Sequence, residues 1–161
     1  MSRPSLTRYS VDELVAAHKT VWKTLPVTDL GSRKDNPSIR LDLRRVDSPN
    51  IEIGLIFEAH SPRKPLPGVA SVRRPSASLL WRGERVRGID WTIKHEVIFD
   101  GVPTGEVIRG WHEHYWTDKD GTKSLRAPRS TPKNSDLSAL ISWCCSEWNI
   151  EDVPEPMRLF L

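Results

Sequence analysis

The spacing of apolar residues near the N-terminus predicts an amphipathic helix. Ser10-Val11-Asp12-Glu13 has the form of a capping box, in which the serine and glutamate side chains each bond the other residue's backbone amide. We expect this helix to end near Leu25-Pro26, because the residue before a proline avoids the helical region. Its apolar stripe, which recurs at helical spacing, consists of Val11, Leu14, Val15, His18, Trp22 and Leu25.

The middle of the chain shows the alternation of apolar and polar residues that is typical of β-strands. Residues 39–44 alternate strictly, whereas residues 51–59 are apolar on both faces and should lie nearer the centre of a sheet. Residues 60–76 are rich in proline and arginine and form a connection too long for a tight hairpin. The predicted strands cover residues 39–44, 51–59, 79–81, 86–99 and 107–116.

A second helix is predicted near the C-terminus, where Ser135-Asp136 can cap it and apolar residues again lie on one side. A run of strands between two helices indicates an α+β fold. We expect an antiparallel meander sheet or part-barrel of about five strands, flanked by an N-terminal and a C-terminal helix. At 161 residues the chain is most simply a single domain over residues 1–161.

Composition narrows the class of protein without identifying its task. Hydrophobic residues make up 37% of the chain and charged residues 28%. The sequence contains no run of the roughly 18 apolar residues that a membrane helix needs, and its N-terminus lacks the apolar core of a secretory signal. The adjacent cysteines Cys144 and Cys145 do not indicate a disulfide framework. We therefore expect a cytoplasmic protein that does not contact a membrane.

Basic residues are concentrated in one part of the chain. The formal net charge is +3, which favours anionic partners only mildly. Between residues 63 and 87, however, basic residues greatly outnumber Glu84, and such an excess can bind phosphates. A solvated, arginine-rich loop and hairpin explains the same residues equally well. The candidate nucleic-acid-binding residues are Arg63, Lys64, Arg73, Arg74, Arg82, Arg85, Arg87 and Arg109.

The most informative chemistry lies in residues 110–116, whose sequence is GWHEHYW. Pairing of Phe99 with Glu106 would place three histidines on one face of a hairpin, because opposite residues in an antiparallel pair point the same way. A slip of one residue in this register would send the histidine of the first strand to the other face. The three residues are His95, His112 and His114.

A histidine cluster beside arginines predicts acid–base chemistry on nucleic acid. Histidines can act as general base and general acid on an RNA 2′-hydroxyl and its leaving 5′-oxygen, while arginines stabilise the phosphate. The leading interpretation is a nucleic-acid-acting protein that binds RNA in preference to DNA. It would be a small metal-independent ribonuclease of toxin or phage-defence type, with no cofactor. Its catalytic residues would be His95, His112, His114 and Tyr115.

Other classes of function stay open. A His-x-His pair on a strand with a third histidine can bind a divalent metal, and Asp118 is a candidate acidic ligand. A non-catalytic binding or inhibitor protein of a phage or mobile element, with a protein or nucleic-acid partner, would also use the basic segment. A tryptophan-rich sheet that carries histidines at its rim, without any function for them, is a further explanation.

One group of residues resembles a known pattern over about residues 79–150. The pattern is Arg-x-x-Asp, then a histidine, then Ile-x-Gly-x-His-x-His-Tyr, followed by an apolar C-terminal helix. It resembles a group of small bacterial proteins of unknown function, and several such groups are associated with mobile elements, phages or toxin–antitoxin loci. The resemblance implies no activity, fold or substrate. It is carried by Arg87-Gly88-Ile89-Asp90, His95, residues 108–115 and Trp148-Asn149-Ile150.

Overall fold

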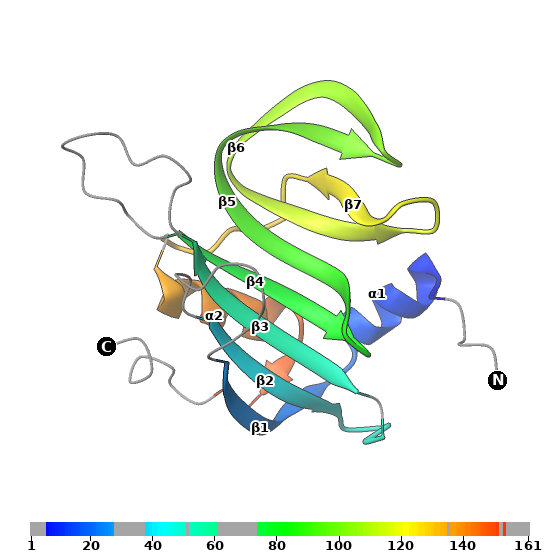
Figure 1. The fold of residues 1–161 in the computed structure, drawn as a ribbon, viewed down its shortest axis with the longest axis vertical. Coiled ribbons are helices and arrows are strands. Elements are labelled where there is room, and N and C mark those ends of the chain that lie inside the picture. Colours follow the sequence, from blue (N-terminus) through cyan, green and yellow to red (C-terminus); the bar gives the residue numbers. More distant parts are fainter. Residues whose placement is uncertain are drawn as a thin grey trace.

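The described part of the chain forms two helices and one curled, eight-stranded mixed sheet (Figure 1). This computed structural model describes residues 6–27, 38–50, 52–60, 74–134, 136–151 and 153. The strand order is β6-β7-β5-β4-β3-β2-β1-β8. The elements are α1 (Arg8–Ala16), β1 (Lys19–Val27), β2 (Ser38–Arg45), β3 (Ile53–His60), β4 (Arg74–Trp81), β5 (Glu84–Phe99), β6 (Val102–Thr117), β7 (Gly121–Arg126), α2 (Leu137–Glu147) and β8 (Ile150–Glu151).

The predicted α+β class is confirmed, but the sheet is larger than the predicted meander of about five strands. Three strands were not predicted: β1, β7 and β8. The sheet is also mixed and not purely antiparallel, because β8 runs parallel to β1. Strands β2, β3 and β5 lie close to the predicted ranges, whereas β4 begins at Arg74 and not at residue 79 as predicted. Strand β3 is central, between β2 and β4, as its two apolar faces indicated.

The N-terminal helix begins earlier and ends much earlier than predicted. Thr7 caps it, since its hydroxyl accepts from the Ser10 amide at 3.2 Å, and the Ser10 hydroxyl accepts from the Thr7 amide at 2.9 Å. The following residues, 19–27, form β1 and pair with β2. This segment carries β-branched residues such as Val21, which favour a strand once a neighbouring strand is present to pair with it.

The hydrophobic core lies between the sheet and the two helices. Inward-facing residues of β2 and β3 alternate with more exposed ones, as period-two strands require. Helix α2 begins at the predicted cap Asp136, whose carboxylate accepts from the Ala139 amide at 2.7 Å, and it packs against β4. Its buried residues are Leu140, Ile141, Trp143 and Cys144. No helix in the described ranges is long and apolar enough to cross a membrane.

A buried lysine joins the ends of the two helices. Lys19 is fully buried, and its Nζ donates to the carbonyls of Val15 at 2.9 Å, of Trp148 at 2.7 Å and of Ala17. These carbonyls lie at the C-terminal ends of α1 and α2, where backbone acceptors have no partner inside the helix. Burial, followed by the charge of Arg45, lowers the pKa of Lys19 to about 7.

The hairpin of β5 and β6 extends beyond the main sheet and bends over (Figure 1). Each strand has 16 residues, far longer than the other strands of the sheet. Strand β7 pairs with both of them, because Leu125 lies opposite His114 on β6 and opposite Ile98 on β5. The three strands therefore close into a small curl, in which the buried Leu125 shares a face with His114.

Candidate functional site

The β5–β6 hairpin turns at Asp100 and Gly101, whose backbone φ angles are 49° and 77°. Positive φ at both central residues marks a two-residue turn of type I′, for which Asp-Gly is a favoured sequence. Phe99 therefore pairs with Val102 and not with Glu106. The predicted register is wrong because it assumed a longer turn in place of this one.

Around the histidines the pairing differs from the prediction by three residues, since Trp91 lies opposite Trp111 instead of His114. Side chains alternate between faces along a strand. An odd shift would therefore, by itself, separate His95 from His112 and His114 by the thickness of the sheet.

A β-bulge in β5 cancels the effect of that shift. Thr92 pairs with Gly110 and His95 pairs with Ile108, so β5 advances by three residues where β6 advances by two. The extra residue reverses the alternation of side chains beyond it. The ring centroids of His95 and His112 are accordingly 5.3 Å apart. The predicted histidines do meet, although on a different register from the predicted one.

Asp90 lies opposite His112 and completes the cluster. The Oδ2 atom of Asp90 is 3.0 Å from Nε2 of His114 and 3.9 Å from Nε2 of His112. The two histidine rings have centroids 5.0 Å apart, and one potential ligand atom from each of the three residues lies within 4.8 Å of the others. Two imidazole nitrogens and a carboxylate oxygen form a donor set suited to divalent transition metals.

The cluster is closed on one side and open on the other. The side chain of His112 is 5% exposed, that of His114 is 16% exposed and that of Asp90 is 30% exposed. Solvent therefore meets the cluster mainly at Asp90. A small ligand can approach from this side, whereas His112 lies behind the other two residues.

Burial and charge set the protonation of the cluster. Burial lowers the pKa of His112 to about 4, with help from the charges of His114 and His95 and against the attraction of Asp90. Burial raises the pKa of Asp90, but the hydrogen bond from His114 and the nearby positive charges outweigh it and hold that pKa below its ordinary value. At neutral pH the cluster thus contains a neutral imidazole at His112 and a carboxylate at Asp90.

His95 lies beside the cluster, with its ring centroid 5.3 Å from that of His112. Its Nδ1 lies 3.0 Å from the backbone carbonyl of Glu96. A carbonyl oxygen only accepts hydrogen bonds, so Nδ1 is the donor in this contact. A backbone carbonyl of this kind commonly orients metal-binding histidines from behind.

Two of the predicted site residues lie on the opposite face of the hairpin. Arg87 is 5% exposed, and its guanidinium pairs with Asp12 at 2.9 Å and with Glu113 at 3.5 Å. Tyr115 is 7% exposed, and the Arg126 guanidinium lies 4.3 Å from the centre of its ring. Neither residue contacts the histidine cluster, so their predicted catalytic and binding roles gain no support from their positions.

The remaining predicted residues are scattered. Arg82 lies with its guanidinium 4.7 Å from the Trp81 ring, Arg109 is exposed, and Asp118 accepts from the Arg8 amide at 2.6 Å at the start of α1. Asp118 is therefore not a ligand of the cluster. Arg85 is the predicted basic residue whose charge reaches Asp90. The structure does not describe Arg63, Lys64 and Arg73, and it describes only the backbone of Arg74.

Asp90 is the site residue that sequence reasoning missed. Counting back from the Asp100-Gly101 turn with regular pairing would place Asp90 opposite Trp111, on the other face from His112, and only the register shifts within the hairpin bring Asp90 opposite His112. Comparison of the chain with protein-family models, with curated proteins and with solved structures gave no match. The resemblance to small bacterial proteins therefore stays a prediction.

Proposed function

We propose that this protein is a histidine-ligated metalloprotein. Asp90, His112 and His114 hold a divalent transition metal, while His95, whose ring centroid lies 5.3 Å from that of His112, becomes a fourth ligand only if its ring moves toward the ion. The observation that carries the proposal is the convergence of three ligand atoms within 4.8 Å at the open end of a β-curl. Neutral imidazoles with a carboxylate are the ligands of many zinc and non-haem iron sites.

The distances support this assignment. Two ligand atoms that lie about 2.0–2.2 Å from one ion are separated from each other by roughly 3.0–3.6 Å. The separations from Asp90 Oδ2 to the two imidazole nitrogens, 3.0 and 3.9 Å, bracket that range. All three ligand atoms lie within 4.8 Å of one another, so the two imidazole rings as well as the Asp90 side chain have to move slightly inward to bind one ion.

The burial of the ligands suits a metal better than metal-free catalysis. A general acid or base must come within hydrogen-bond reach of the substrate, and His112 lies behind its neighbours with 5% of its side chain exposed. A neutral, buried imidazole is nevertheless well suited to bind a metal, because no proton has to be removed from it. A metal held here would act as a Lewis acid on a bound oxygen atom.

A metal-independent ribonuclease is the second candidate, and one contact favours it. Nε2 of His114 bonds to Asp90 at 3.0 Å, as in catalytic dyads where a carboxylate orients an imidazole. In this case RNA is the substrate and His114 is the general base. Cleavage of RNA in the presence of a chelator, lost in His114→Ala, would favour this candidate over the metal.

Metal analysis of untagged protein tests the first proposal directly. We expect one equivalent of metal per chain in the wild type. Asp90→Asn should lower the zinc affinity about 100-fold, because even changes to residues that only support metal ligands weaken metal binding by about 10- to 100-fold. His18→Gln is the matched control, since His18 pairs with Glu151 outside the cluster. Wild-type protein that takes up no stoichiometric metal at neutral pH contradicts the proposal.

A further inference from the structure

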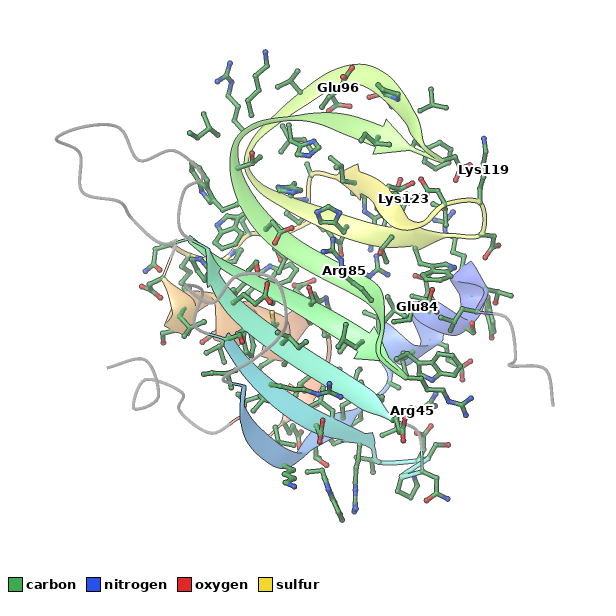
Figure 2. The ribbon with its side chains drawn as sticks, viewed as in Figure 1. Arg45, Glu84, Arg85, Glu96, Lys119 and Lys123 are labelled. Atoms are coloured by element: carbon green, nitrogen blue, oxygen red, sulfur yellow. The ribbon has the colours of Figure 1, made fainter. Side chains whose placement is uncertain are left out.

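Arg85 reaches the face of the candidate site through a second β-bulge. Leu79 pairs with Arg87 and Leu80 pairs with Arg85, so Val86 is an extra residue at the start of β5. Strict alternation would put Arg85 on the face of Arg87, and the bulge turns it the other way. Figure 2 shows Arg85 near the start of β5 and Glu96 farther along the same strand, near the bend.

A glycine makes room for the Arg85 guanidinium beside the cluster. A Cβ atom on Gly88 would lie 3.0 Å from Cζ and 3.0 Å from Nε of Arg85. Gly88 is opposite His114 on the neighbouring strand, and its missing side chain would point to the same face as Asp90. The guanidinium therefore lies over the backbone directly next to the proposed metal ligands.

The Arg85 guanidinium has hydrogen-bonding capacity to spare. Its Nε is buried without a hydrogen-bond partner among the described residues, and within the same part of the chain no carboxylate forms an ion pair with it. Arg87, two residues away, also has a buried Nε without a partner in the described residues, but its terminal guanidinium nitrogens pair with two carboxylates, and those of Arg85 do not. A half-buried guanidinium with unused donors next to a cluster open to solvent is suited to bind an oxyanion.

We propose that Arg85 and the metal at Asp90, His112 and His114 form a two-point site for the phosphoryl group of an anionic substrate. This inference rests on the proposed function. The guanidinium donates paired hydrogen bonds to two phosphoryl oxygens, and the metal ion binds a third. Such an arrangement stabilises negative charge where it builds up on a phosphate ester.

Inorganic phosphate and the cobalt-loaded protein provide the test. Cobalt(II) bound to imidazoles absorbs visible light, so its spectrum reports both metal binding and the arrival of phosphate at the metal. We expect phosphate to bind the wild type with a defined spectral change and Arg85→Gln to bind it roughly 10- to 100-fold more weakly, because one charge-assisted contact is lost. Arg44→Gln is the control, since it removes one positive charge on β2, where Arg44 lies over the Trp22 ring.

A second variant tests the geometry without removing the charge. Gly88→Ala places a methyl group against the guanidinium and should weaken phosphate binding less than Arg85→Gln, with cobalt affinity unchanged. If cobalt binds with one equivalent and Arg85→Gln binds phosphate as tightly as the wild type, or if acetate binds as tightly as phosphate, the inference is wrong and the metal centre stands. If the wild type binds no cobalt, the proposed function itself fails.

Discussion

The two faces of the β5–β6 hairpin carry similar residue types and use them differently. On the face that meets α1, Arg87 pairs with Asp12 and Glu113, and Glu113 pairs in turn with Arg126 at 3.0 Å. Each charge in this network has a partner of opposite sign within the protein. Such pairs are costly to break and leave little capacity for an outside ligand.

The other face of the same hairpin has donors and acceptors left over. Asp90 bonds to His114, while Nδ1 of His112 and Nε of Arg85 are buried without a hydrogen-bond partner in the described residues. The contrast shows that one face of this hairpin stabilises the fold, whereas the other face has groups available to bind a ligand. Regular alternation supplies the paired network, and two bulges in β5 turn His95 and Arg85 to the binding face.

Disrupting the ion pairs on the hairpin face that meets α1 should give the largest loss of stability. Arg87→Met removes the guanidinium, 7% exposed, that holds the two carboxylates together. We expect the free energy of unfolding to fall by about 3–5 kcal/mol, because a buried carboxylate at Glu113 loses a partner. Denaturant titration measures this change, and zinc affinity should stay within about threefold of the wild type. A strong loss of zinc affinity in the folded variant would show that the two faces are not independent.

On the hairpin face that carries the histidine cluster, His112 should control how stability depends on pH when no metal is present. His112 has a pKa of about 4 in the folded protein and an ordinary pKa of 6.5 when unfolded. The unfolded state therefore takes up a proton as the pH falls from 6.5 to 4, and stability decreases over this window, by at most about 3 kcal/mol. Thermal unfolding in chelator checks this slope, which His112→Gln should flatten. Equal slopes for the two proteins would mean that His112 is not the group responsible.

Metal should stabilise the wild type but not a variant of the binding face. At a zinc concentration 100 times the dissociation constant, the wild type gains about 2.7 kcal/mol of stability. Asp90→Asn should gain almost none at the same zinc concentration, while its stability in chelator stays within about 1 kcal/mol of the wild type. Comparison of the four unfolding curves measures both effects. A variant that zinc stabilises as much as the wild type would remove Asp90 from the ligand set.

The smallest effect is expected at the bulge. Gly110 has a φ angle of 90°, in the region that favours glycine, and lies opposite Thr92 where the bulge begins. Gly110→Ala should cost about 1–2 kcal/mol through backbone strain alone. If the bulge also fixes His95, zinc affinity should fall several-fold. Loss of stability with unchanged affinity would show that His95 does not bind the metal.

The sequence predicted the elements whose pattern is local. Strict alternation identified β2, and Asp136 identified the start of α2. Strand β7 was not predicted, because Gly-Thr-Lys-Ser-Leu-Arg has no apolar alternation and is a strand only through its pairing with β5 and β6. The N-terminal stripe fitted a helix and a strand about equally well beyond His18, and the pairing of β1 with β2 decided between them.

The sequence predicted the three histidines of the candidate site but not the strand register that brings them together. The register depended on the Asp100-Gly101 turn, which is visible in the sequence, and on two bulges, which are not. A bulge arises where a long strand has to bend around a neighbour, and β5 bends to accommodate β7. This is why Asp90 and the position of Arg85 emerge only from the fold.

The lysine at the junction of the helices ties together segments 129 residues apart in the chain. An ammonium group that loses one of its carbonyl acceptors must find a water molecule in its place or give up its proton. Both cost free energy inside a packed interior. A fragment that ends before α2 would therefore also loosen the first helix and the first strand. Deleting α2 should therefore unfold more of the protein than the helix itself.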